Sequence, residues 1–247
     1  SESLQLRCIG TGDAFGSGGR LNSCYLLQAG EERLLMDCGC SSLIGLQRCG
    51  VDPATIDTIV ISHLHGDHFG GIPFLFLEAK FVSCRQRPLT LIGPPGLQAQ
   101  VDAALEALYP GTINDALDFP LVYRQLESGR QLTQGCFQIG CCQVKHGRSR
   151  DVYALRVDVA GRAVAFTGDT EWTDNLIALS DGTDLVLAEC FAYAQPVPSH
   201  LDYQTLLQQR DKLNCQRLLL THLGPEMLEK RAELKLEFAS DGDLIEF

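Results

Sequence analysis

Short apolar runs separated by turn residues recur along the chain and predict a protein rich in β-strands. Alternating apolar and polar residues over 4–9 predict a first strand, and continuous apolar runs over 56–62, 89–92 and 184–188 predict buried strands. Further strands are expected at 22–28, 33–37, 119–126, 136–145, 153–159, 162–167 and 217–221, with two short strands about residues 240–243.

Helical spacing of apolar residues predicts helices between many of these strands. The segment 71–81 is apolar on most sides and is expected to be a buried helix, and Pro94-Pro95-Gly96 precedes a helix over 97–108. Other helices are expected at 41–49, 173–179, 202–213 and 225–234, the last one charged and exposed. Strands and helices alternate in both halves without a linker, which favours one α/β domain over residues 1–247 with helices on both faces of two facing sheets.

The composition is that of an ordinary globular protein, with 45% hydrophobic and 21% charged residues among 247. No stretch of about 18 consecutive apolar residues is present, so we expect no membrane partner. The formal net charge is −11, whereas proteins bind duplex or structured nucleic acid through Lys and Arg that neutralise phosphates. The charge therefore argues against a large nucleic-acid partner, although it leaves room for a local basic patch.

Eleven cysteines are present, an odd number without any Cys-x-x-Cys pair. Most lie inside apolar runs, as Cys24 and Cys190 do, where a thiol behaves as a small buried hydrophobe. A disulfide framework is the alternative, but this placement favours reduced thiols in a cytoplasmic protein.

The segment Gly10-Thr11-Gly12-Asp13-Ala14-Phe15-Gly16 superficially resembles a dinucleotide-binding fingerprint. Its spacing departs from Gly-x-Gly-x-x-Gly, and no helical pattern follows it. We interpret it as a turn that brings the backbone close to a site.

Candidate chemistry is concentrated in the stretch 59–71, where an apolar run ends in His63-Leu64-His65-Gly66-Asp67-His68. Imidazole and carboxylate together form a ligand set that suits Zn²⁺ and neighbouring first-row metals. The alternative is a polar turn after a strand, and such a turn is expected to hold Gly, Asn, Asp or Ser instead. The stretch therefore predicts a metal site.

Three further ligand-type residues follow apolar runs downstream: His146, Asp169 and His222. Each has an alternative role, because a single histidine is often a hydrogen-bonded surface or core residue and an aspartate after Thr-Gly suits a turn. In open α/β sheets, however, sites form beyond the carboxyl ends of the strands. We therefore expect these three residues to converge with the 63–68 cluster in one crevice.

Together these motifs resemble the metallo-β-lactamase superfamily. The pattern His-x-His-x-Asp-His is complete at residues 63–68, and Asp37, His146, Asp169 and His222 stand at the other matching positions. The resemblance covers nearly the whole chain and implies a four-layer αββα sandwich. It also implies two metal ions, the first held by His63, His65 and His146, the second by Asp67, His68 and His222, with Asp169 bridging them and Asp37 orienting the ligands.

A site of this kind implies hydrolysis. Two metal ions that share a bound water lower its pKa and generate a bridging hydroxide, and they polarise a carbonyl or phosphoryl oxygen. Zinc is the expected metal, and manganese or iron also suits these ligands.

Several stretches are most similar to the branch of ribonuclease Z and small phosphodiesterases, namely residues 10–12, 20–23, 68–73 and 88–97. Glu189-Cys190-Phe191 followed by Ser199-His200 resembles a later motif of this branch, in which histidine contacts the scissile phosphate. Leu201 and Asp202 depart from that motif, so a loop histidine is the alternative. The long basic arm with which ribonuclease Z enzymes grip tRNA has no counterpart over 81–126, where only Arg85-Gln86-Arg87 is markedly basic.

The expected function is that of a dinuclear-metal phosphodiesterase acting on a small phosphodiester or cyclic phosphate. Asp67 is expected to orient or deprotonate the nucleophile, and His200 to protonate the leaving oxygen. Lys145, Arg148 and Arg150 are candidates for binding this small anionic ester, with a solvated loop as the alternative.

Other functions stay open because the same metal site serves several ester classes. They are hydrolysis of a lactone, thioester, sulfate ester or β-lactam, ribonuclease Z-like RNA processing, and metal binding without turnover in a carrier protein. The sequence also leaves a homodimer open.

Overall fold

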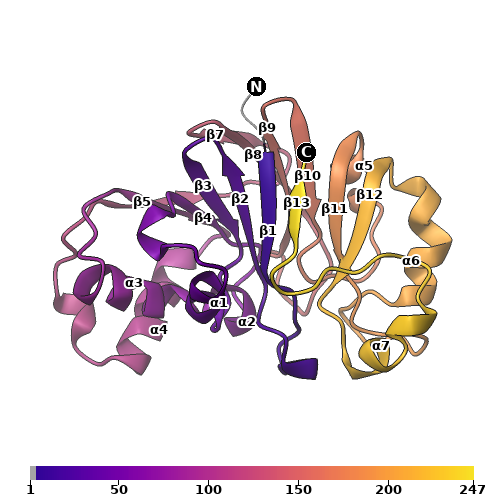
Figure 1. Cartoon of the computed structure of the whole chain (residues 1–247), viewed down its shortest axis with the longest axis horizontal. Coiled ribbons are helices and arrows are strands. Elements are labelled where there is room, and N and C mark those ends of the chain that lie inside the picture. Colours follow the sequence, from indigo (N-terminus) through magenta and orange to yellow (C-terminus); the bar gives the residue numbers. More distant parts are fainter. Residues whose placement is uncertain (1–3) are drawn as a thin grey trace.

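Two β-sheets lie face to face in the computed structural model, which describes residues 4–247, and helices cover the outer side of each sheet (Figure 1). The first three residues of the expected domain lie outside the described part. The first sheet has the order β13-β1-β2-β3-β4-β5-β6, with β3 to β6 parallel. Its strands are β1 (Leu4–Gly10), β2 (Cys24–Ala29), β3 (Glu32–Met36), β4 (Thr58–Val60), β5 (Leu89–Gly93), β6 (Leu121–Gln125) and β13 (Leu244–Glu246).

The second sheet has the order β12-β11-β10-β9-β8-β7, and its strands β10, β11 and β12 run parallel. Its strands are β7 (Gln131–Gln134), β8 (Phe137–Gln143), β9 (Tyr153–Val159), β10 (Arg162–Phe166), β11 (Thr183–Glu189) and β12 (Cys215–Thr221). Each sheet thus combines an antiparallel part with a parallel part, and the two halves of the chain repeat this plan.

The helices fall into two sets that follow the two halves of the chain (Figure 1). With the first sheet lie α1 (Ser42–Arg48), α2 (Gly66–Phe69), α3 (Ile72–Phe81) and α4 (Leu97–Leu108). With the second lie α5 (Asn175–Ser180), α6 (Tyr203–Gln209) and α7 (Pro225–Glu229). Short 3₁₀ turns are η1 (Ser17–Gly19), η2 (Pro53–Thr55), η3 (Thr112–Asn114), η4 (Arg210–Lys212) and η5 (Arg231–Glu233). Among residues 4–247, no helix is both long and apolar enough to cross a membrane.

Three apolar cores separate the four layers. The central core lies between the sheets and joins residues of both, including Tyr25 of β2 and Phe166 of β10, whose ring centroids are 5.1 Å apart. A second core packs α1, α3 and α4 on the first sheet, and a third packs α5, α6 and α7 on the second. This arrangement confirms the αββα sandwich expected from the resemblance.

Three expected elements differ from those observed, and one observed strand was not expected. The run 56–62 is a strand only over β4, because Ser62 turns to the second sheet, where its carbonyl accepts a bond of 3.0 Å from the Tyr153 amide. β7 was not expected, since its polar residues form an edge strand. The segment 225–234 is not one helix, because α7 ends at Glu229, and its Met227 is buried. At the C-terminus only β13 forms, while Phe238 makes one isolated bridge.

Candidate metal centre

The loop after β4 supplies four of the candidate ligands. Ser62 ties this loop to the second sheet, and the chain then forms the single helical turn α2, in which the His68 amide donates to the His65 carbonyl at 3.0 Å. Asp67 and His68 lie on this turn, while His63 and His65 precede it. In the motif His-x-His-x-Asp-His, the first two histidines therefore lie before the helical turn, whereas the aspartate and the last histidine lie on it.

The second sheet supplies the other three candidate ligands from the ends of its strands. His146 follows β8, Asp169 follows β10 and His222 follows β12. The His222 amide donates to the Thr11 carbonyl at 2.9 Å, so the turn at Gly10 to Gly12 does bring backbone to the site. Only glycine fits at position 10, since a Cβ there would lie 1.9 Å from the Asn22 carbonyl oxygen.

Three imidazoles form a first group of potential donors. His65 Nδ1 lies 3.2 Å from His63 Nε2 and 3.0 Å from His146 Nε2. His63 and His146 are buried, and His65 is exposed. Three ring nitrogens at such short separation are suited to bind one cation between them.

A second group combines two carboxylates with two imidazoles. His68 Nε2 lies 3.1 Å from Asp67 Oδ2 and 3.3 Å from Asp169 Oδ2, and His222 Nε2 lies 3.3 Å from Asp67 Oδ2. Asp169 Oδ2 also lies 3.9 Å from His63 Nε2 and 3.7 Å from His146 Nε2. Asp169 thus stands between the two groups, the place that a bridging carboxylate requires.

The protonation states agree with cation binding. Burial is the main cause that lowers the pKa of His63, His65 and His146, so these imidazoles are neutral, the form in which histidine binds a metal. Burial would also lower the pKa of His222, but the carboxylates of Asp169 and Asp67 outweigh it and raise this pKa to about 9. The second group therefore has an electrostatic environment that favours positive charge.

Among the buried atoms of the second group that make no hydrogen bond within the described residues are His68 Nε2 and Asp169 Oδ1. A buried polar atom without a partner costs about 1–3 kcal/mol. A cation between these atoms would satisfy them, and nitrogen with carboxylate oxygen is the donor set of zinc and related metals. The residues present therefore fit a metal cofactor.

Asp37 supports the second group through hydrogen bonds to His68 and Ser62. Its fully buried carboxylate accepts bonds from His68 Nδ1 at 2.6 Å, from the Ser62 amide at 2.7 Å and from the Ser62 hydroxyl at 2.8 Å. The bond to Nδ1 leaves His68 Nε2 directed to the donor group, as a carboxylate behind a metal-binding histidine does.

His200 lies beside both groups, on the side of the second sheet. Its Nδ1 is 2.7 Å from Glu189 Oε1, and its ring stacks on His222 with centroids 5.6 Å apart. Burial would lower the pKa of His200, but the hydrogen bond to Glu189 and its charge outweigh this and raise the pKa. The structure thus supports a cationic His200 near the donor groups.

Glu189 belongs to the motif that the sequence shares with His200, but no role was predicted for it. It is fully buried at the end of β11, and its carboxylate also accepts bonds from the Thr170 and Phe191 amides, each at 3.1 Å. Its position at the end of a strand, shared with His146, Asp169 and His222, was the available signal. Ser199 is a second residue without a predicted role. Its carbonyl lies 2.8 Å from His146 Nδ1 and so orients that ring.

Backbone strain is concentrated at this site. Asp37 (φ 60°), Ser199 (φ 71°) and His222 (φ 56°) are three of the five non-glycine residues with positive φ among those described. Such conformations cost on the order of 1–3 kcal/mol and are found where function fixes a side chain.

A cleft of about 270 Å³ opens on the side of the first group, and Arg148 lines it together with His63, His65 and His146. Lys145 and Arg150 are exposed on the same loop but do not line this cleft. Of the three basic candidates, Arg148 is therefore the one that the structure places at the site.

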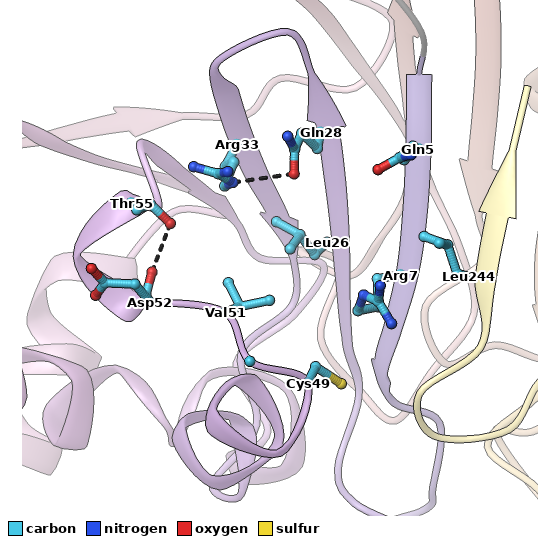
Figure 2. A pocket seen from close by; sticks show the side chains of 11 residues that line it. Gln5, Arg7, Leu26, Gln28, Arg33, Cys49, Val51, Asp52, Thr55 and Leu244 are labelled. Carbon is cyan, nitrogen blue, oxygen red and sulfur yellow. Dashed lines mark hydrogen bonds between the residues drawn. The ribbon is translucent and has the colours of Figure 1, made fainter.

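A separate hollow of about 340 Å³ lies on the outer face of the first sheet, beside α1 (Figure 2). Arg33 Nε donates to Gln28 Oε1 across it at 3.2 Å. It is lined by Gln5, Arg7, Leu26, Gln28, Arg33, Cys49, Gly50, Val51, Asp52, Thr55 and Leu244. None of the candidate ligands lines this hollow.

Comparison with known proteins agrees with this geometry. The family model described as Anti-Pycsar protein Apyc1 matches residues 4–245. The chain is 28% identical to ribonuclease Z of Limosilactobacillus fermentum over 93% of its length and 90% of the relative. It is also 28% identical to the probable metallo-hydrolase YhfI of Bacillus subtilis, over 89% of this chain and 87% of the relative.

Solved structures show the same fold. The crystal structure of YhfI, described as a metallo-β-lactamase fold protein, covers 100% of both chains with a TM-score of 0.79 at 25% identity. Human tRNase Z, short form, covers 98% of both chains with a TM-score of 0.79 at 24% identity. The chain therefore belongs to the Anti-Pycsar protein Apyc1 family and is a metallo-hydrolase with the metallo-β-lactamase fold.

Proposed function

We propose that this metallo-hydrolase is a phosphodiesterase that cleaves a small phosphodiester or cyclic phosphate. The proposal rests above all on the pair formed by buried Glu189 and half-buried His200 beside the donor groups. A cationic imidazole at this place suits the negative charge that a phosphoryl group brings and the leaving oxygen that must be protonated. A ribonuclease Z among the relatives, itself named for cleaving RNA, is consistent with phosphodiester chemistry.

Two zinc ions are proposed as the cofactor, with manganese or iron also suited to these ligands. His63, His65 and His146 would hold one ion and Asp67, His68 and His222 the other, and Asp169 lies between the two groups of residues. Ions in these positions would supply an activated water and polarise the phosphoryl oxygens.

Four residues of this chain then have separate roles in the reaction. Asp67 orients the attacking water and accepts its proton as the new bond from oxygen to phosphorus forms. His200 donates the proton of its free ring nitrogen to the leaving oxygen as the second ester bond breaks. Glu189 holds the other nitrogen of His200 and keeps the ring charged before the step. Arg148 binds an outer oxygen of the anion from the cleft.

A small substrate agrees with the rest of the surface. In ribonuclease Z enzymes that process tRNA a basic arm is expected in the region 81–126, whereas here this region forms β5, α4, η3 and β6. Of its two arginines near residue 86, Arg85 is buried and donates to backbone carbonyls, whereas Arg87 is exposed and paired with Asp57. No basic surface for a long RNA is therefore found in this region of the described chain.

A substrate panel tests the proposal. Protein reconstituted with zinc is assayed with bis-p-nitrophenyl phosphate, cyclic nucleotides, a precursor tRNA, an aryl sulfate, a thioester and a lactone, and its metal content is measured. We expect about two metal equivalents and turnover of the small phosphodiesters, abolished in Asp169→Ala. Turnover of the lactone or thioester alone would assign another ester class, and metal binding without any turnover would indicate a carrier protein.

The role of His200 is tested separately. His200→Ala should lower kcat for a cyclic phosphate by about 10²–10⁴ while the metal content stays at its original value. Loss of metal from this variant would show that His200 is a ligand rather than a proton donor.

A further inference from the structure

The outer face of the first sheet carries polar side chains near its antiparallel edge. Along β1, Leu4 and Leu6 belong to the central core, so the alternating residues Gln5 and Arg7 lie on the outer face. The helix α1 contacts β1 only near the end of this strand, at Ile9. The hollow of about 340 Å³ beside α1 lies on the same face, over the part of β1 that precedes this contact (Figure 2).

Two half-buried arginines from different strands line this hollow. Strand pairing places Arg7 of β1 opposite Leu26 of β2. It places Arg33 of β3 opposite Gln28, which lies two residues further along β2. The two arginines are thus two strands apart, which corresponds to roughly 10 Å between their backbones. A small molecule on Leu26 can therefore contact both guanidinium groups.

Neither guanidinium forms an ion pair with an acid among residues 4–247. Their side-chain bonds go to neutral groups, since Arg7 Nη1 donates to the Gly242 carbonyl at 3.3 Å and Arg33 Nε donates to Gln28 Oε1 at 3.2 Å. The acid that lines the hollow is Asp52, whose carboxylate accepts a backbone amide and caps the start of η2. Two positive side chains and one negative side chain therefore line this hollow, in a protein whose formal net charge is −11.

The same hollow has an apolar part. Leu26 is only 4% exposed, and Val51 lies beside it in the segment between α1 and η2 (Figure 2). Leu244 of β13 is 44% exposed and is paired with Arg7 across the strands. The lining therefore offers an apolar surface next to the two charged donors, which suits a molecule that has both an anionic and an apolar part.

We propose that the hollow beside α1 binds a small organic oxyanion, a carboxylate or a phosphate monoester whose apolar substituent packs on Leu26 and Val51. Arg7 and Arg33 bind the oxygens of this anion, because a guanidinium stays charged and offers several N–H donors in one plane. The volume of about 340 Å³ lies within the range of small-molecule sites. None of the candidate metal ligands lines this hollow, so the site is independent of the proposed phosphodiesterase function.

The test measures the binding of four small molecules to the zinc-loaded protein by calorimetry. Hexanoate and hexyl phosphate carry both parts of the proposed ligand, acetate lacks the apolar chain, and hexanol lacks the charge. We expect at least one of the two hexyl anions to bind, acetate to bind about tenfold or more weakly, and hexanol not to bind. The hexyl anion with the lower Kd identifies the head group. This Kd should increase with salt, because attraction between exposed charges is screened.

Cys49 reports whether the anion occupies this hollow. Its half-buried thiol lines the hollow, whereas Cys84 is exposed between α3 and β5. At saturation the hexyl anion should slow alkylation of Cys49 by N-ethylmaleimide several-fold, measured for each cysteine peptide by mass spectrometry. The rate at Cys84 should stay unchanged. Alkylation of Cys49 at an unchanged rate would overturn the proposal.

Substitutions identify the residues that bind the anion. Arg7→Met and Arg33→Met remove the charge but keep a long side chain, and each should raise Kd about tenfold. Arg130→Met, which removes an exposed arginine paired with Glu127, should leave Kd unchanged. If a hollow variant does not fold, the protection of Cys49 in the original protein decides the result.

Three further outcomes would overturn the proposal. One is the absence of binding of both hexyl anions to the original protein. Another is an equal increase of Kd in Arg130→Met, which would mean that net charge causes the attraction. The third is weaker binding in Arg148→Ala but not in Arg7→Met or Arg33→Met, which would place the anion at the metal centre. None of these outcomes affects the proposed phosphodiesterase, because the hollow contains none of its donors.

Discussion

At the scale of single residues, Asp37 shows how the chain supports a ligand without touching the substrate. It combines positive φ with three hydrogen bonds to Ser62 and His68. Asparagine tolerates positive φ and has the same shape, but it lacks the charge that fixes the His68 ring. We expect Asp37→Asn to lower zinc affinity about 10- to 100-fold, measured by competition with a chelating dye. Zinc affinity equal to that of the original protein would show that the carboxylate charge plays no part.

Arg148 offers a second prediction at this scale. Its side chain is the cationic one placed in the cleft, so Arg148→Ala should raise KM for an anionic phosphodiester about 3- to 10-fold with little change in kcat. Because the residue is exposed, the effect should shrink as salt increases. The control is Arg130→Ala, which removes an equally charged and exposed side chain from the turn before β7. Equal increases of KM in both variants would mean that the net charge of the protein causes the effect and would exclude a specific contact of Arg148 with the substrate.

At the scale of elements, one buried arginine joins the segments that lead into the ligand loop. Arg85 is 4% exposed and donates to the carbonyls of Ile56 at 2.6 Å, Pro88 at 2.7 Å, Arg87 at 2.7 Å and Ala54 at 3.2 Å. It therefore ties η2 and the start of β4 to the turn between α3 and β5. These contacts position β4, which leads into the loop that carries His63.

Removing this arginine leaves several carbonyls without a donor. We expect Arg85→Ala to lower the free energy of unfolding by about 3 kcal/mol, measured by urea denaturation, without loss of activity per folded molecule. Arg87→Ala, which loses one exposed pair with Asp57, should cost less than about 1 kcal/mol. Comparable losses of unfolding free energy in the two variants would mean that the buried hydrogen bonds of Arg85 do not stabilise the fold.

Strands with continuous or alternating apolar residues were predictable from the sequence, as β5, β9, β10 and β11 show. Elements whose pattern is set by their place in the fold were not: β7 is polar because it lies at a sheet edge, and the segment after Gly224 is divided because Met227 must be buried. The candidate ligands were predictable because a motif marks them. The role of Glu189 was not predictable although it lies in the motif with His200, since only the fold places its carboxylate against the His200 ring.

At the scale of the whole molecule, the candidate centre connects the two halves. His63, His65, Asp67 and His68 come from the loop after β4 of the first sheet, and the other three candidate ligands come from the second sheet. A cation held between them binds only when both sheets are in place. Metal binding therefore stabilises the folded state by mass action, by about 2.7 kcal/mol when the free metal is a hundred times its Kd.

Chelation should consequently lower the thermal midpoint, and the size of this effect should depend on pH. In the metal-free protein the carboxylates of Asp169 and Asp67 raise the folded pKa of His222 to about 9, above the ordinary value of 6.5. Protonation of His222 then stabilises the metal-free fold fully below about pH 6.5, and this contribution is lost as the pH rises through about 9. The affinity for the metal instead increases as the pH rises, because protons must leave the ligands before the metal binds.

We therefore expect the difference in midpoint between zinc-loaded and chelator-treated protein to increase from pH 6 to pH 9, measured by differential scanning fluorimetry at fixed free zinc. His222→Gln, which cannot take up this proton, should reduce the pH dependence of the midpoint of the chelated protein across that range, and His68 and His200, whose pKa values are also raised, account for the part that remains. Asn175→Gln, an amide substitution at the start of α5 outside the donor groups, is the control for general pH effects. A difference in midpoint that stays constant or falls with pH would contradict the exchange of protons for metal at this centre, and with it the charge balance inferred from the carboxylates around His222.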